Sequence, residues 1–266
     1  LKVVDPIQSL FAAGMVGGVS LTRKSLKIDL STEDLNWIDV TDGISGTVSC
    51  IEFSTDGNHM FVGTGHSSGG SVYRLSGLND VYTTADAANL SFVNLNVSGG
   101  SVTGIAVDPN NPDNVVVTSG NYGQSNFVWR STNATTANSN AFTSIQGNLP
   151  PMPCFDAVIM VDRPGYCVVG TDMGVWATED VYASSVVWTD ENGSMAHTPV
   201  FAVRQQSLPY GASQHNRGQI YLGTHGRGMW ESTAGTGIGE FNDGSFNNKE
   251  LISDLKLYPN PMSTNA

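Results

Sequence analysis

Short apolar runs that end in glycine or a small polar residue recur along the chain at a nearly constant spacing. A short β-rich apolar run bounded in this way predicts a buried strand. When Ala13, Gly63, Ser119, Gly170 and Gly223 are taken as equivalent, the intervals between them are 50, 56, 51 and 53 residues. A fixed period of this length indicates an internal structural repeat. The five runs are residues 9–14, 59–65, 114–120, 166–172 and 220–226.

The neighbours of each run repeat as well, and they predict three further strands in each unit. The strands expected before the runs are residues 2–6, 48–53, 102–109, 156–161 and 200–204. The third strands, expected after the runs, are residues 18–22, 71–75, 127–131, 174–178 and 228–232. The fourth strands are expected at residues 36–40, 92–95, 142–145 and 186–189.

Four antiparallel strands in about fifty residues, repeated with few helices, predict the blades of a β-propeller. The alternative is a parallel β-helix, which has shorter coils and lacks hairpin turns. We therefore expect an all-β chain with five visible blades that are part of a larger ring. The blades are assigned to residues 1–41, 42–97, 98–150, 151–195 and 196–234.

The fifth unit lacks a recognisable fourth strand, because the chain runs into the glycine-rich segment 235–239 soon after Trp230. An unpaired edge strand is a liability for edge-to-edge association. A propeller usually closes its ring with a strand from the other end of the chain. We therefore expect the closing strand upstream of Leu1.

The overall charge bears on the choice of partner. Lys and Arg total 12 and Asp and Glu total 24, which gives a net charge of -12. This balance disfavours nucleic acid and anionic lipid, both of which need basic patches. No apolar run approaches the roughly 18 residues of a membrane span, so we expect no transmembrane segment. Residues 1–10 also lack the pattern of a signal peptide, so either there is no export signal or the true N-terminus lies upstream.

The sequence predicts no metal site and no cofactor. Cys50, Cys154 and Cys167 show neither CxxC nor Cys/His ligand spacing. Cys167 is expected opposite about Met160 rather than Cys154, which disfavours a disulfide. The segment 108–113 offers enough oxygen ligands for calcium, but its spacing fails the EF-hand pattern, and a turn is the favoured interpretation.

The repeats resemble the BNR or Asp-box propellers, which include sialidase-like, sortilin-like and xyloglucanase-like rings. The strand ends at 63–65 and 223–226 carry the resemblance, together with degenerate Asp-box turns at 31–37, at 131–134 before Phe142 and at 178–180 before Trp188. These turns depart from the Ser-x-Asp-x-Gly-x-x-Trp spacing of the family. Their expected role is structural, and Asp34 and Asp180 are not expected to be catalytic.

The segment 255–261, Leu-Lys-Leu-Tyr-Pro-Asn-Pro, resembles the opening of the C-terminal sorting domain of type IX secretion substrates. The resemblance implies a flexible linker at 235–250, the first strand of a β-sandwich sorting domain within 251–266, and translocon components as partners. It also implies a secreted protein or one at the outer-membrane cell surface of a diderm bacterium. The sorting signal would be Leu257, Tyr258, Pro259, Asn260 and Pro261.

Loops that join the second and third strands of each repeat carry the candidate ligand-binding residues. Propellers present ligands on the face where these loops ring the central axis, so residues distant in sequence are expected to converge there. His, Asp and Arg side chains suit carboxylate binding or acid-base chemistry, and Tyr suits stacking on a sugar. The candidates are His66, Tyr122, Asp172, His225 and Arg227.

The leading functional hypothesis is a binding module without enzymatic activity that recognises a glycan or a surface protein. One alternative is a secreted polysaccharide-degrading glycoside hydrolase, which would need two carboxylates across the scissile bond. Another is a structural subunit of a surface or secretion complex. No catalytic constellation is evident in the sequence, which favours the binding module.

Overall fold

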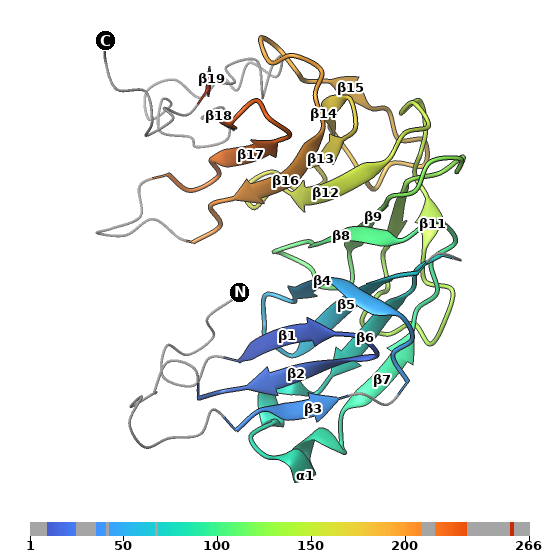
Figure 1. Cartoon of the computed structure of the whole chain (residues 1–266), viewed down its shortest axis with the longest axis vertical. Coiled ribbons are helices and arrows are strands. Elements are labelled where there is room, and N and C mark those ends of the chain that lie inside the picture. The colour runs from blue at the N-terminus through green and yellow to red at the C-terminus, as the bar shows by residue number, and fades with distance from the viewer. Residues whose placement is uncertain are drawn as a thin grey trace. The chain divides into compact units, whose positions relative to one another are not determined.

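The computed structural model describes residues 10–24, 36–40, 43–66, 69–208 and 216–232, together with the strand at 256–257. The chain is all-β and divides into two compact units, Leu1–Ser144 and Ile145–Ala266. Each unit is built from antiparallel sheets whose strands follow one another in chain order (Figure 1). Few helices were expected, and the described helices are the 3-10 turn η1 (Leu78–Asp80) and the short helix α1 (Thr84–Ala87).

The described residues of the N-terminal unit form three sheets. The first has three described strands, β1 (Phe11–Met15), β2 (Gly18–Thr22) and β3 (Ile38–Val40). The second has four, β4 (Thr47–Phe53), β5 (His59–Gly65), β6 (Val72–Ser76) and β7 (Ser91–Asn94). The third also has four, β8 (Val102–Val107), β9 (Val115–Ser119), β10 (Val128–Ser131) and β11 (Thr143–Ser144).

In the part of the C-terminal unit that the structure describes, there are two four-stranded sheets. The first is formed by β12 (Cys154–Ile159), β13 (Cys167–Thr171), β14 (Gly174–Thr178) and β15 (Thr189–Asp190). The second is formed by β16 (Val200–Gln205), β17 (Ile220–Thr224), β18 (Met229–Ser232) and β19 (Lys256–Leu257). The predicted four-stranded antiparallel units are thus confirmed as sheets, and the strand expected at 2–6 lies outside the described residues.

The last sheet corrects one expectation. Its fourth strand is β19, which pairs with β18 through Trp230 opposite Leu257 and Glu231 opposite Lys256. The strand therefore comes from downstream of the blade and not from upstream of Leu1. This strand was not predicted because it is distant from β18 in the sequence and lies in the segment that resembles the opening of a sorting domain.

Apolar side chains fill the space between consecutive sheets within each unit. In the C-terminal unit one buried cluster joins residues of β13 and β14, such as Val168 and Val175, to residues of β16 and β17, such as Val203 and Leu222. In the N-terminal unit, one cluster joins the first and second sheets and another joins the second and third. Because each sheet buries apolar residues against its neighbour, the sheets stabilise one another by removing apolar surface from water.

The first strand of each four-stranded sheet contains a register shift at the same place. The shifts lie between Val48 and Cys50, Val102 and Gly104, Cys154 and Asp156, and Val200 and Ala202. A bulge leaves one residue without a cross-strand partner and re-aims its side chain. The residues at these positions are Ser49, Thr103, Phe155 and Phe201.

Asp156 follows one of these bulges and links the two sheets of the C-terminal unit. The residue is 6% exposed, and its carboxylate accepts hydrogen bonds from the Val203 backbone N–H at 2.8 Å and from the Arg204 guanidinium. The other carboxylate oxygen accepts from the Ala157 N–H at 3.0 Å. Burial raises the pKa of Asp156 by more than these partners lower it, so its pKa lies above the usual value for an aspartate.

The raised pKa predicts a specific pH dependence of stability. Because the folded state holds the Asp156 proton more tightly than the unfolded chain, this residue's contribution to the free energy of unfolding falls as pH rises from about 3.8 through the raised pKa. Urea titrations of the wild type and of Asp156→Asn over pH 4 to 7 measure it. The free energy of unfolding of the wild type, relative to that of Asp156→Asn, should fall as pH rises. A difference that stays constant with pH would contradict the assignment.

None of the three cysteines is in a disulfide. Cys167 lies opposite Ile159, and Cys154 lies opposite Thr171, so the hairpin does not bring the two thiols to paired positions. Both side chains are fully buried, and burial raises the pKa of each thiol. Among the described residues, no helix is long and apolar enough to cross a membrane.

Candidate ligand-binding face of the C-terminal unit

Three of the loops that join second to third strands share one backbone anchor. In three sheets the first loop residue donates its backbone N–H to the carbonyl of the residue just before the first strand. These pairs are Gly120 to Ser101 at 2.9 Å, Asp172 to Pro153 at 3.0 Å, and His225 to Pro199 at 2.8 Å. The anchor holds equivalent loops at the same end of each sheet.

In the N-terminal unit, the predicted residues His66 and Tyr122 lie on two loops that meet at Ser101. The Ser101 hydroxyl donates to the His66 carbonyl at 3.2 Å, and it accepts from the Asn121 side-chain amide at 3.5 Å. Tyr122 is 72% exposed. His66 also borders an open depression of about 440 Å³ lined by residues of β5 and β6 and of the connections before β4 and β8.

The C-terminal unit carries the other three predicted residues. Asp172 sits in the tight turn between β13 and β14 and is partly exposed. His225 and Arg227 lie in the loop between β17 and β18, where the Arg227 carbonyl accepts a hydrogen bond from the Trp230 indole at 3.1 Å. Convergence of all five predicted residues stays a prediction.

Two phenylalanines that the sequence analysis did not select lie beside His225. Phe155 and Phe201 occupy the bulge positions of β12 and β16, and their rings pack edge to face with centroids 4.7 Å apart. The His225 ring packs on Phe201 in the same manner at 5.5 Å. Because Phe201 is 49% exposed, the row of three rings forms a partly exposed aromatic surface on this unit, which we call the aromatic row.

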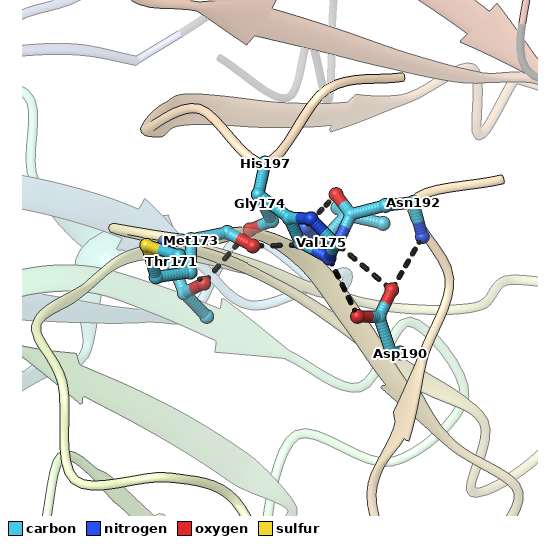
Figure 2. A network of polar contacts seen from close by, with 7 residues as sticks. All are labelled: Thr171, Met173, Gly174, Val175, Asp190, Asn192 and His197. Carbon is cyan, nitrogen blue, oxygen red and sulfur yellow. Dashed lines mark hydrogen bonds and ion pairs between the residues drawn. The ribbon is translucent and has the colours of Figure 1, made fainter. Parts of the chain in front are cut away.

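A polar network occupies the connection that leads into β16 (Figure 2). The Asp190 carboxylate pairs with His197 Nε2 at 2.8 Å, and its other oxygen accepts from the Asn192 backbone N–H at 2.9 Å and side-chain amide at 2.8 Å. Asn192 in turn donates to the Met173 carbonyl at 3.3 Å and accepts from the Val175 N–H at 3.0 Å. The network thereby fixes the β15–β16 connection to the β13–β14 turn.

The network keeps Asp190 ionised. Burial raises the pKa of Asp190, but the hydrogen bonds from Asn192 and His197 and the charge of His197 lower it by a larger amount. The net pKa is therefore below the usual range for an aspartate. His197 is 53% exposed at its side chain, and the next residue, Thr198, donates its hydroxyl to the His225 carbonyl at 3.2 Å. The polar network and the aromatic row are therefore joined along the chain.

Two of the three segments expected to be Asp-box turns contain local hydrogen bonds. The Ser131 hydroxyl and the Asn133 side chain hydrogen-bond to each other at 3.1 Å, and Asp180 accepts from the Tyr182 N–H at 2.8 Å. The box at 31–37 lies mostly outside the described residues, as does Asp34.

The segment 108–113 forms a turn, in which Asp108 accepts the Asn110 N–H at 2.8 Å and the Asn114 amide at 3.3 Å. In the part of the chain that the structure describes, no group of three or more His, Cys, Asp or Glu side chains is placed to hold a metal ion.

No family model matches the chain. No curated protein matches it either. The crystal structure of Sqt1 from Chaetomium thermophilum is similar, with a TM-score of 0.57 and 14% sequence identity. The similarity covers 86% of this chain and 54% of that one, so the chain spans about half the length of Sqt1. At this identity the likeness shows the fold alone.

The aromatic row could have been found from the repeat itself. Ser49, Thr103, Phe155 and Phe201 are the bulged residues of successive first strands; Thr103, Phe155 and Phe201 are second in their strands, and Ser49 is third in β4. The third of these strands was expected to begin at 156, two residues later than β12 begins, which removed Phe155 from the comparison. Neither residue of the Asp190–His197 pair was predicted, because His197 lies in the irregular β15–β16 connection and Asp190 ends a strand of only two residues.

Proposed function

We propose that the chain forms blades of a β-propeller that acts as a binding module, and that the aromatic row of the C-terminal unit is part of its ligand-binding face. The five consecutive antiparallel sheets, four of which share a bulge and three a loop anchor, support a ring of repeated blades. The observation that carries the functional part is the placement of Phe155 and Phe201 beside His225.

This surface has the composition of a recognition site. Ligand sites combine an apolar or aromatic surface with a few polar groups that fix orientation. Here the rings of Phe155 and Phe201 provide the apolar surface, and the loops with Asp172, Arg227 and His197 provide the polar groups at the same end of the unit. Such a surface suits the apolar face of a sugar ring or an apolar side chain, so a glycan or a surface protein is the proposed ligand.

The state of Asp190 does not fit the general acid of a glycoside hydrolase. A glycosidase general acid needs a raised pKa so that it stays protonated at its working pH. The pKa of Asp190, in contrast, is lowered by its hydrogen bonds to Asn192 and His197. This carboxylate is suited to hold His197 in place and not to protonate a leaving group.

We further propose that the protein is exported as cargo of a type IX secretion system and acts outside the cell or on the outer-membrane surface of a diderm bacterium. The support is the segment 255–261 with its Tyr-Pro-Asn-Pro sequence. Residues 258–261 lie outside the described residues, and Leu257 is the last residue of β19.

A polysaccharide array tests the ligand-binding face. Phe201→Ser places at this bulge the residue type that Ser49 provides in the N-terminal unit. We expect it to weaken binding of any polysaccharide retained by the wild type at least about tenfold, because a central aromatic anchor contributes about 1 to 2 kcal/mol or more. Val187→Ser, which changes a 63% exposed residue on the β14–β15 connection, is the matched control and should bind as the wild type does.

Two outcomes of the same experiment would count against the proposal. Equal binding by the wild type, Phe201→Ser and Phe155→Ser would place the ligand elsewhere. Cleavage of a polysaccharide that is lost on changing Asp172 would show a hydrolase in place of a binding module.

A further inference from the structure

The pairing of β19 with β18 follows the register of the other fourth strands. In the three sheets with a tryptophan on the third strand, that tryptophan lies opposite the second residue of a two-residue fourth strand. The pairs are Trp129 with Ser144, Trp176 with Asp190, and Trp230 with Leu257. Lys256–Leu257 therefore occupies the place in its sheet that β11 and β15 occupy in theirs.

β19 differs from β11 and β15 in the length of the connection that precedes it. Ten residues separate β14 from β15 and eleven separate β10 from β11, whereas 23 residues separate β18 from β19. Closing a longer loop costs more conformational entropy, by a factor of about three in the docking equilibrium for each doubling of length. Loop length alone therefore favours undocking of β19 over undocking of β11 or β15.

The contact that holds β19 is a main-chain ladder. An exposed sheet edge accepts an extended segment through backbone hydrogen bonds, so the edge itself does not restrict which chain supplies the strand. When β19 leaves, the outer edge of β18 is left as such an acceptor, because β17 pairs with its other side.

We propose that the outer edge of β18 is an acceptor site for an extended strand, and that this chain's own segment around Lys256–Leu257 fills it exchangeably. While the segment is docked, Leu257 belongs to the last sheet. If the segment 257–261 also serves as the sorting signal, its use there requires it to leave β18. The acceptor site itself rests on the strand register and is independent of the proposed ligand and export route.

The test uses the full chain with both strand residues changed, Lys256→Pro and Leu257→Pro. In an antiparallel pair only one of two successive residues directs its N–H to the partner strand. Proline at both positions removes that donor whichever residue it is. The probe is a synthetic peptide of residues 251–261 with the natural sequence, and its control is the same peptide with proline at 256 and 257.

Hydrogen exchange and peptide binding give the expected results. The β18 amides that face β19 should exchange at least tenfold faster in the double variant than in the wild type, and the natural peptide should restore their protection. The fluorescently labelled natural peptide should bind the double variant at least tenfold more tightly than it binds the wild type, whose edge is occupied. The proline peptide should bind neither. Unchanged exchange in β12 and β13 serves as the control for folding.

Two results would overturn the proposal. Equal exchange of the β18 amides in the wild type and the double variant would show that β19 does not cover the edge. Failure of the natural peptide to bind a folded double variant would show that the edge does not accept a strand in trans. If the double variant does not fold, the labelled natural peptide is added in excess to the wild-type chain. Slow uptake of the peptide would support an exchangeable strand, and no uptake would contradict it.

Discussion

Replacing Gly174 with alanine is expected to lower the free energy of unfolding of the C-terminal unit by about 3 to 5 kcal/mol. Gly174 begins β14 with a φ of +97°, in the left-handed region that disfavours a side chain. A Cβ at this position would overlap the side-chain amide of Asn192. Asn192 would have to move, which breaks its hydrogen bond with the Val175 N–H and its contacts with Asp190 (Figure 2).

Urea unfolding followed by circular dichroism measures this effect, and Gly226→Ala is its matched control. Gly226 also has a positive φ, +73°, but a Cβ there would meet nothing within 4 Å. The control therefore carries the backbone strain alone, about 1 to 2 kcal/mol. Equal losses in the two variants would show that the contact between Gly174 and Asn192 does not stabilise the unit.

Gly170→Ala is expected to destabilise the same unit by about 2 to 4 kcal/mol, because it overpacks the space between its two sheets. Gly170 lies on β13, where an added Cβ would come within 2.6 Å of the Val200 carbonyl oxygen and within 3.1 Å of the Val203 side chain. The carbonyl belongs to the backbone of β16 and has no rotamer that relieves the contact. The two strands would have to separate.

The equivalent glycine of the next sheet provides the control for Gly170→Ala. At Gly223, an added Cβ would lie 3.4 Å from Ala202 Cβ, an ordinary van der Waals contact. Gly223→Ala should change the urea midpoint little, within about 1 kcal/mol of the wild type. A loss at Gly223 as large as the loss at Gly170 would mean that close packing of β13 against β16 is not the cause.

The pattern of apolar runs was a sound guide to the strands, because a strand that is buried on both faces leaves a continuous apolar run in the sequence. The second strand β5 and the third strands β2 and β14 have the predicted bounds. The fourth strands were less well placed. β15 begins at Thr189, three residues after the predicted start, because an edge strand of two residues has too little pattern to locate it.

The repeat located loop positions of the candidate site, but it did not locate the bulged residues or the Asp190–His197 pair. The spacing of the repeats places Asp172 and His225 at equivalent loop positions, and the shared backbone anchor agrees with this. The aromatic row depends on which residue of the first strand is bulged, and alternation along a strand does not reveal a bulge. The pairing of Asp190 with His197 depends on the path of the β15–β16 connection, and an irregular connection has no periodic sequence pattern from which its path could be predicted.

The amino-acid sequence alone was enough to determine the all-β class, the period of about fifty residues and the succession of strands within each sheet. These features follow from local patterns, since burial on a sheet imposes apolar residues at short range. Only the tertiary structure decided which segment completes the last sheet, which side chains the bulges expose and how Asp156 links β12 to β16. Such features join residues distant along the chain through backbone hydrogen bonds and close packing, which leave little trace in local composition.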